Sequence, residues 1–202
     1  VIDAKLLLVD EEAQIEAEVV AFHRQAMAVY ADFGFTDIAL KIALRPDKRI
    51  GDDDLWSRAE DTLRAGLRAC ETPWEELPGD GAFYGPKIDV KLIDAIGRRW
   101  QASTIQFDFN LPRRFDVRYT DHDGQEQYVY MVHRAIMGSL ERFIGILTEH
   151  FAGDFPVWLA PEQARVLSVS RDQHAYAEEV ANALREKGLR VDSDVREEKI
   201  GF

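Results

Sequence analysis

Apolar residues recur at every third or fourth position in two long stretches of the chain, which is the spacing of one helix face. The first stretch predicts a helix from Asp10 to Phe33, with an apolar face of Ile15, Val19, Phe22, Ala26, Tyr30 and Phe33. Acidic residues favour its N-terminus, and Gly34 ends it. The second stretch predicts a helix capped by Asp53 or Asp54, with an apolar face of Leu55, Ala59, Leu63 and Leu67.

Shorter stretches predict β-strands between and after these helices. The predicted strands cover residues 37–43, 88–92 and 100–110, and the Asp-Gly pair in DHDGQEQ, residues 121–127, predicts a hairpin turn. Successive antiparallel strands with few helices between them predict an α+β fold with an antiparallel or mixed sheet. Neither a G-x-G-x-x-G string nor a Walker A string occurs, so a Rossmann domain is not indicated.

The strand predicted from Trp100 to Asn110 is unusually polar for a buried strand. It carries Gln101 and Gln106 in a run that also holds Ile105, Phe107 and Phe109. An unpaired buried amide costs roughly 1–3 kcal/mol, so such residues are tolerated when they face a polar pocket.

A glycine- and proline-rich loop is predicted from Pro73 to Lys87, with PGDGAFYGPK at its centre. Its composition permits a tight, irregular backbone that holds Tyr84 and Lys87. Two interpretations remain open from the residues alone: the start of a hairpin with an anchoring tyrosine, or the wall of a binding site.

The string MVHRAIMGSLERFIGIL, residues 131–147, predicts a short strand, a tight turn at Gly138 and a helix capped by Ser139. This places His133 at a strand end and Arg142 in the first helical turn. A guanidinium there suits a phosphate or a purine, and an imidazole suits a metal ion. The alternatives are a structural hydrogen-bonding histidine and a solvated arginine.

The string FAGDFPVWLAPEQ, residues 151–163, closes the first domain, with a predicted boundary near residues 159–162. A strand at 165–170, a helix at 173–187 and a strand at 189–195 predict the opening of a parallel β-α-β unit. About forty residues are too few to cover such a sheet. We therefore expect two domains, 1–160 and 161–202, the second a truncated module.

Composition narrows the class of protein. The chain has 202 residues, a net charge of −12 and a pI near 4.9, which argues against binding to nucleic acid through bulk charge alone. The single cysteine, Cys70, excludes an internal disulfide and fits a reducing cytoplasm. No run of 18 apolar residues occurs, so we expect no membrane partner.

The strings GSLER, HRAIMGSLERFIGILTEHFAG, GAFYGPKID and WLAPEQ resemble the class II aminoacyl-tRNA synthetase family, and within it the threonyl-tRNA synthetases. GSLER is similar to the third signature motif of the class. The resemblance runs from about Phe33 to Phe202. It implies an antiparallel sheet with flanking helices, followed by the start of an α/β anticodon-binding domain.

The resemblance also implies roles for individual residues. Arg142 would pack on the adenine of ATP and reach its γ-phosphate, and Lys87 would lie near a substrate phosphate or carboxylate, which makes these two the catalytic candidates. Tyr84 would lie near the amino group of the amino acid, and His133 would bind zinc. The implied substrate-binding residues are Tyr84, Gln101, Gln106, Ser139 and Arg142.

The activity implied is ATP-dependent attachment of threonine to its tRNA, with magnesium accompanying ATP and zinc in the parent protein. The implied partners are tRNA(Thr), threonine, ATP and a second copy in a homodimer. The strings GAFYGPK and HRAIMGSLERF disfavour a synthetase for proline or serine. A non-catalytic paralogue that acts as an RNA-binding or regulatory module remains the alternative.

The N-terminal residues depart from the family pattern. The first signature motif and most of the second should precede Val1, so we expect this chain alone to be inactive. A zinc-binding histidine should fall at Lys5, after Asp3, which would otherwise contact the threonine hydroxyl. Protonated lysine is a poor zinc ligand. Either the N-terminal alignment is shifted or the zinc site is lost.

Overall fold

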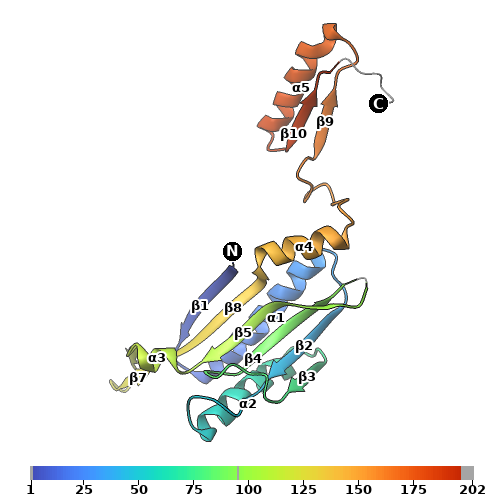
Figure 1. Cartoon of the computed structure of the whole chain (residues 1–202). Helices are drawn as coiled ribbons and strands as arrows, with labels where there is room; N and C mark the ends of the chain where they lie inside the picture. The colour runs from blue at the N-terminus through green and yellow to red at the C-terminus, as the bar shows by residue number, and fades with distance from the viewer. Residues whose placement is uncertain (1, 95, 197–202) are drawn as a thin grey trace. The chain divides into compact units, whose positions relative to one another are not determined.

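The computed structural model describes residues 2–94 and 96–196, and their side chains from Leu7 onward. The chain forms two compact units, Val1–His150 and Phe151–Phe202, each of which is described by itself. Figure 1 shows the elements of both units. This division falls between His150 and Phe151, and the domain boundary expected near residues 159–162 stays a prediction.

A six-stranded sheet with the order β1-β8-β5-β4-β2-β3 forms the centre of the first unit. Its strands are β1 Ile2–Val9, β2 Ile38–Ala43, β3 Trp74–Leu77, β4 Lys87–Ile93, β5 Arg99–Asp108 and β8 Tyr130–Ser139. All neighbours are antiparallel except β2 and β3, which are parallel. The predicted α+β fold with a mainly antiparallel sheet is confirmed.

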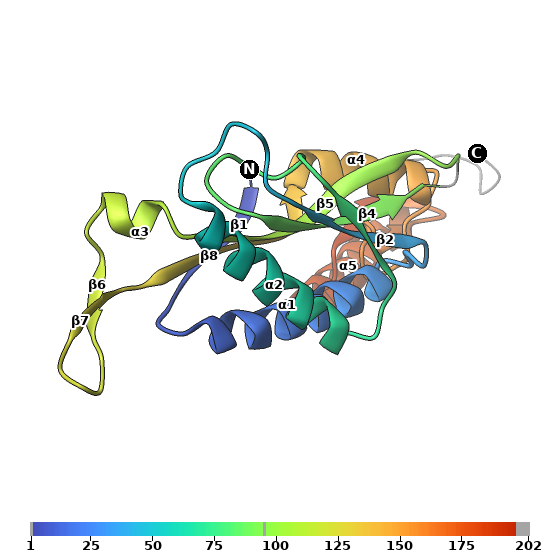
Figure 2. The ribbon, with the colours of Figure 1, turned by 90° about the horizontal axis from the view of Figure 1, so that it is seen from below.

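Two helices, α1 Glu12–Asp32 and α2 Asp53–Ala69, cover the same face of this sheet (Figure 2). The core between them and the sheet consists of apolar side chains that are at most 2% exposed, among them Val19, Phe22, Leu63, Leu67, Ile88, Val90 and Ile105. Burial of each such side chain contributes about 1.5–3 kcal/mol, so this face supplies much of the stability. Both helices match their predicted ranges to within two residues.

The N-cap of α2 differs from the prediction. Asp52 takes this position, and its Oδ1 accepts a hydrogen bond from the Leu55 N–H at 2.8 Å. Asp53 and Asp54 lie in the first turn instead. Three consecutive aspartates can each serve as a cap by residue type, so the sequence alone did not select among them.

Strand β8 continues further than predicted, so the tight turn expected at Gly138 is wrong. The strand ends at Ser139 and is followed directly by α4, Leu140–His150. Gly138 lies inside it with a φ of 67°, and a Cβ there would lie 2.7 Å from the Ala102 carbonyl oxygen. Glycine therefore permits close contact between strands here, where an end of the strand was expected.

Three elements of the first unit were not predicted. Strand β3 lies within the predicted loop 73–87, and its exposed Glu75 and Glu76 hide the apolar alternation of a strand. Strand β1 was not predicted either, and neither was the four-residue helix α3, Leu111–Arg114.

The predicted hairpin is confirmed as β6 Arg118–Thr120 paired with β7 Glu126–Tyr128. It projects from the sheet (Figure 2). Asp121 accepts the backbone N–H groups of Asp123 and Gln125 at 3.0 and 2.8 Å, and Gly124 has a φ of 75°. This is the turn chemistry that an Asp-Gly pair indicates.

The second unit contains β9 Ala164–Leu167, the short helix η1 Arg171–Gln173, α5 His174–Glu186 and β10 Val191–Asp194. Strand β10 pairs with β9 in parallel, which confirms the predicted β-α-β order. Ala177 and Ala181 are the buried residues of α5. No helix among the described residues is long and apolar enough to cross a membrane.

Candidate active site

The sheet face opposite α1 and α2 carries most of the predicted site residues. Because side chains alternate along a strand, burial of Ile88 and Val90 under the helices places Lys87 and Asp89 on the other face. The strand register pairs Lys87 of β4 with Gln106 of β5, and Gln106 with His133 of β8. These three residues therefore form a row across three neighbouring strands.

Asp89 is the centre of a first hydrogen-bonded network, although only 1% of it is exposed. Its Oδ2 accepts from the Lys87 ammonium at 2.7 Å. Its Oδ1 accepts from the Gln101 amide at 2.7 Å and from the Thr104 hydroxyl at 2.9 Å. Both carboxylate oxygens are thus occupied by donors from β4 and β5.

A second network involves Tyr84 and Gln106. The Tyr84 hydroxyl donates to Gln106 Oε1 at 2.8 Å, and Gln106 Nε2 donates to the Gly85 carbonyl at 3.3 Å. Burial raises the pKa of Tyr84, the Asp108 charge raises it further, and the bond to Gln106 opposes the shift. The Tyr84 phenol therefore stays protonated and acts as a donor at neutral pH.

His133 is paired with a buried carboxylate. Its Nε2 lies 2.9 Å from Asp108 Oδ2, and the Asp108 side chain is fully buried whereas that of His133 is 33% exposed. Asp108 Oδ1 accepts the backbone N–H groups of Asn110 and Leu111 at 2.8 and 3.0 Å. The carboxylate is thus fixed by backbone donors and in turn fixes the imidazole.

Two glycines allow the loop that carries Tyr84 to lie against the sheet. A Cβ on Gly85 would lie 1.8 Å from the Phe107 carbonyl oxygen, and one on Gly81 would lie 2.5 Å from that of Leu44. The Ile50 N–H also donates to the Phe83 carbonyl at 2.8 Å. The glycines of GAFYG are therefore needed because the loop backbone lies close to neighbouring backbone, and not because the loop must be flexible.

Arg142 lies in the first turn of α4, as predicted. The Ser139 hydroxyl accepts the Arg142 backbone N–H at 3.4 Å, which is the interaction of an N-cap. The Arg142 side chain is exposed, and its guanidinium has no ionic or hydrogen-bond partner in the described part of the chain. An unpaired guanidinium beside a helix N-terminus suits an anion.

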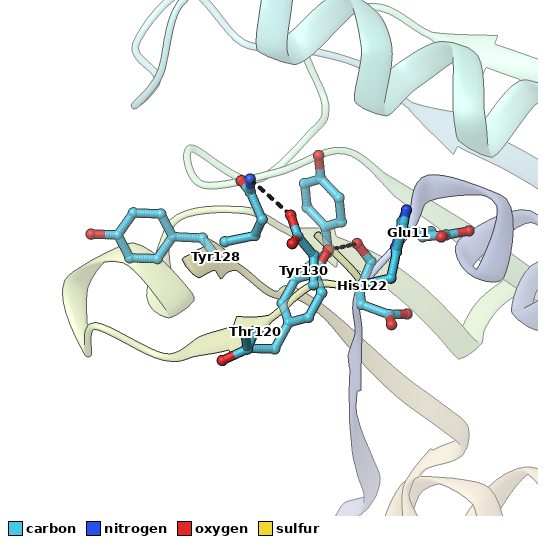
Figure 3. A pocket seen from close by; sticks show the side chains of 9 residues that line it. Glu11, Thr120, His122, Tyr128 and Tyr130 are labelled. Atoms are coloured by element: carbon cyan, nitrogen blue, oxygen red, sulfur yellow. Dashed lines mark hydrogen bonds between the residues drawn. The ribbon is translucent and has the colours of Figure 1, made fainter. Parts of the chain in front are cut away.

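A separate hollow of about 400 Å³ lies between the β6–β7 hairpin and the start of α1 (Figure 3). The Tyr119 hydroxyl donates to the Asp10 carbonyl at 3.1 Å, and the Tyr130 hydroxyl to Glu12 at 3.2 Å. None of the predicted site residues lines it. These contacts hold the hairpin and the start of β8 against the start of α1, and we assign the hollow no binding role.

Comparison with known proteins agrees with this geometry. The model of the class II tRNA synthetase core domain, for glycine, histidine, proline, serine and threonine, matches residues 3–151. The chain belongs to this family. An anticodon-binding domain model matches residues 163–202.

Within the class II synthetases, the chain is similar to threonine–tRNA ligases. It is 60% identical to that of Xylella fastidiosa (strain M23) and 56% identical to that of Xanthomonas campestris pv. campestris (strain B100), each over 191 residues and 95% of this chain. It spans about 30% of the length of these curated relatives. The resemblance inferred from the sequence motifs is therefore confirmed.

Solved structures give the same result. The RNA binding domain of threonyl-tRNA synthetase from Cryptosporidium parvum Iowa II matches with a TM-score of 0.93 and 38% identity, covering 99% of this chain and 50% of that one. The putative threonyl-tRNA synthetase from Aeropyrum pernix matches with a TM-score of 0.79 and 31% identity, covering 96% and 46%. A histidyl-tRNA synthetase from S. aureus, at 19% identity, shares the fold alone.

The structure brings five of the predicted residues together on one face of the class II sheet: Tyr84, Lys87, Gln101, Gln106 and His133. Ser139, at the end of β8, and Arg142, in the first turn of α4, lie apart from these five residues. His133 is inside β8, six positions before Ser139, so the prediction that it ends a strand is wrong. At about 3.3 Å per residue, roughly 20 Å of strand separates them.

Sequence reasoning missed the two acidic residues that organise this face, Asp89 and Asp108. It expected Gln101 and Gln106 to face a polar pocket, and both amides have hydrogen-bond partners within the protein. Asp89 and Asp108 both alternate with the apolar residues of their strands, so the sequence indicates their face but not their burial.

The described side chains contain no group of three His, Cys, Asp or Glu residues that could hold a metal ion. His133 is the one predicted ligand among them. Strand β1 lies beside β8, with Leu6 paired to His133 and Lys5 to Arg134 in the backbone register. The side chains of Asp3 and Lys5 lie outside the described residues, so their predicted departure from a zinc site stays a prediction.

Proposed function

We propose that the full-length protein containing this chain is an ATP-dependent threonine–tRNA ligase, and that this chain supplies one wall of its active site. The row of Lys87, Gln106 and His133 on the sheet face opposite α1 and α2 carries the proposal. Identity of 60% to threonine–tRNA ligases over 95% of the chain supports the substrate assignment.

The proposed reaction has two steps. The threonine carboxylate attacks the α-phosphate of ATP, and the bond to the leaving pyrophosphate breaks to give threonyl-adenylate. A terminal ribose hydroxyl of tRNA(Thr) then attacks the acyl carbon, loses its proton and displaces AMP. Catalysis of this kind depends on positioning and on neutralisation of charge, which fixed donors on a rigid sheet supply.

The cationic residues are assigned to the nucleotide. Arg142 would stack on adenine and contact the γ-phosphate, because its planar guanidinium is exposed and unpaired. Lys87 would bind a phosphate or carboxylate oxygen, since only one of the three N–H bonds of its ammonium is directed to Asp89. Ser139 would keep Arg142 in place through the helix cap.

The neutral residues are assigned to the amino acid. The Tyr84 hydroxyl uses its proton for Gln106, so its lone pairs remain to accept from the substrate ammonium group. Gln106 accepts from the Tyr84 hydroxyl and Gln101 donates to Asp89, and both would shape the floor of the site. Magnesium would enter with ATP, bound to its phosphates.

His133 fits the role of a zinc ligand. Histidine ligands generally donate their second ring N–H to a carboxylate, and Asp108 provides this partner at 2.9 Å. Bound zinc would hold the amino and hydroxyl groups of threonine, and a site that binds the hydroxyl strongly rejects valine. The remaining ligands would come from residues outside the described part of the chain. We also infer a cytoplasmic homodimer as the working form.

ATP–pyrophosphate exchange in the full-length protein tests the proposal. We expect exchange that depends on threonine, and far slower exchange with valine or serine at the same concentration. Exchange with proline but not threonine would reassign the substrate. Absence of exchange with all of these amino acids, in protein that is folded and binds tRNA, would favour the non-catalytic paralogue instead.

A further inference from the structure

Asp89 holds two residues of the proposed site although it is itself almost inaccessible. Only 1% of it is exposed, so it has little area with which to contact a substrate. Its three donors are the Lys87 ammonium, the Gln101 amide and the Thr104 hydroxyl, at 2.7, 2.7 and 2.9 Å. The first two are residues that the proposed function directs to the substrate.

The geometry restricts Lys87 strongly. Its ammonium is the cationic partner of Asp89, and the Lys87 side chain is 18% exposed. A lysine side chain carries roughly 2 kcal/mol of rotamer entropy in solution, so an unrestrained ammonium would sample many positions. The bond to Asp89 fixes one N–H and leaves two others without partners among the described residues.

The pairing also reduces the charge that Lys87 presents. A neighbouring carboxylate partly neutralises an ammonium, which weakens its attraction for the phosphates of bound ATP. Interactions accelerate a reaction only where they are stronger in the transition state than in the ground state. An ammonium that is fixed in place and partly neutralised binds the ground state of ATP less tightly. It still stabilises the additional negative charge that develops in the transition state of the transfer.

We propose that Asp89 is a positioning residue of the site, which acts through Lys87 and Gln101 and limits ground-state binding of ATP. This inference rests on the proposed function. Its distinctive consequence is a divergence of two kinetic constants. Without the Asp89 charge, Lys87 attracts ATP more strongly but is less well placed for the reaction.

The variant Asp89→Asn in the full-length protein tests this consequence. The amide keeps the shape and an acceptor oxygen for Gln101 and Thr104, but removes the charge. We expect kcat of pyrophosphate exchange to fall about 10- to 100-fold, while KM for ATP falls about 2- to 5-fold. A purely structural role would not lower KM for ATP.

Two further variants test whether Asp89 acts on kcat through Lys87. Thr104→Val removes a donor to the same carboxylate and leaves Lys87 untouched, so kcat should change less than about threefold. In a Lys87→Met background, Asp89→Asn should have almost no further effect on kcat, because residues that act as a unit are non-additive. Additive losses in this cycle would overturn the inference.

If Asp89→Asn does not fold, Asp89→Glu replaces it. This variant keeps the charge and moves the carboxylate by one methylene, so a positioning role predicts a lower kcat with KM for ATP unchanged. An unchanged kcat in a folded Asp89→Glu protein would overturn the inference. Absence of exchange in the unmodified protein would instead contradict the proposed function, so the two failures are distinguishable.

Discussion

The two faces of the central sheet are built from the same strands but use their residues differently. On the face under α1 and α2, Ile88, Val90 and Ile105 pack against helices and are at most 2% exposed. On the opposite face, Asp89, Gln106 and Asp108 are also buried, at 1%, 7% and 0% exposure, but take part in hydrogen bonds. Alternation thus assigns apolar packing to one face and polar networks to the other.

The largest expected effect is on the apolar face. Phe22→Ala removes a side chain that is 1% exposed and packs in the core, so the free energy of unfolding should fall by about 3–5 kcal/mol. Urea denaturation, followed through hydrogen exchange of the α1 amides, measures this loss. Exchange activity per folded molecule should not change. A stable but inactive Phe22→Ala protein would break the division between the faces.

Arg142→Ala should have the opposite result. Loss of a charge-assisted contact to ATP should raise the barrier to adenylate formation by about 2–4 kcal/mol, a roughly 30- to 1,000-fold lower rate. The free energy of unfolding should change by less than about 0.5 kcal/mol, because the side chain is exposed and unpaired. Unaltered pyrophosphate-exchange kinetics would remove Arg142 from the site.

Gly85→Ala should affect both stability and substrate binding. Its Cβ would lie 1.8 Å from the Phe107 carbonyl oxygen, so the loop must move away and the bond from Tyr84 to Gln106 should break. We expect a stability loss of about 1–3 kcal/mol together with weaker threonine binding. Gly145→Ala is the matched control, because among the described residues nothing beyond its chain neighbours and the backbone of its own helix lies within 4 Å of the new Cβ. Equal behaviour of the two variants would contradict this account of the loop.

The smallest expected effect concerns the cap of α2. Asp52→Ala removes the acceptor of the Leu55 N–H and should cost about 1 kcal/mol of stability. Asp54→Ala, two positions further along the helix and without a capping bond, should cost less than about 0.5 kcal/mol. Thermal unfolding compares them, and a larger loss for Asp54→Ala would show that the cap is misassigned.

The apolar face could be predicted from the sequence because helical and strand periodicities are local. The hydrogen-bond partners on the polar face could not be predicted, because they depend on the register between strands. Asp89 meets Thr104 and Lys87 meets Gln106 only after β4 and β5 pair, with an irregularity between Val90 and Lys91. Nothing local specifies that irregularity, so the partners of Asp89 could not be derived.

Edge elements were missed for a related reason. Strand β3 lies beside β2 at the end of the six-stranded order, and its exposed glutamates remove the alternation from which a strand is recognised. Gly138 was taken as a turn because glycine often ends an element. Here it permits contact with Ala102 inside a strand, a purpose that only the neighbouring strand reveals.

Val132 and His133 provide the most direct test of the division, because they are adjacent in β8 and lie on opposite faces. Val132 is fully buried, and the His133 side chain is 33% exposed. The measurement is the free energy of unfolding together with threonine-dependent pyrophosphate exchange and its discrimination against valine, for Val132→Ala and His133→Ala in the full-length protein.

We predict that Val132→Ala lowers stability by about 1–3 kcal/mol and leaves exchange per folded molecule unchanged. His133→Ala should lower bound zinc and discrimination against valine about 10- to 100-fold. A zinc-free protein that remains specific for threonine, or equal effects of both variants on exchange and stability, would contradict the account.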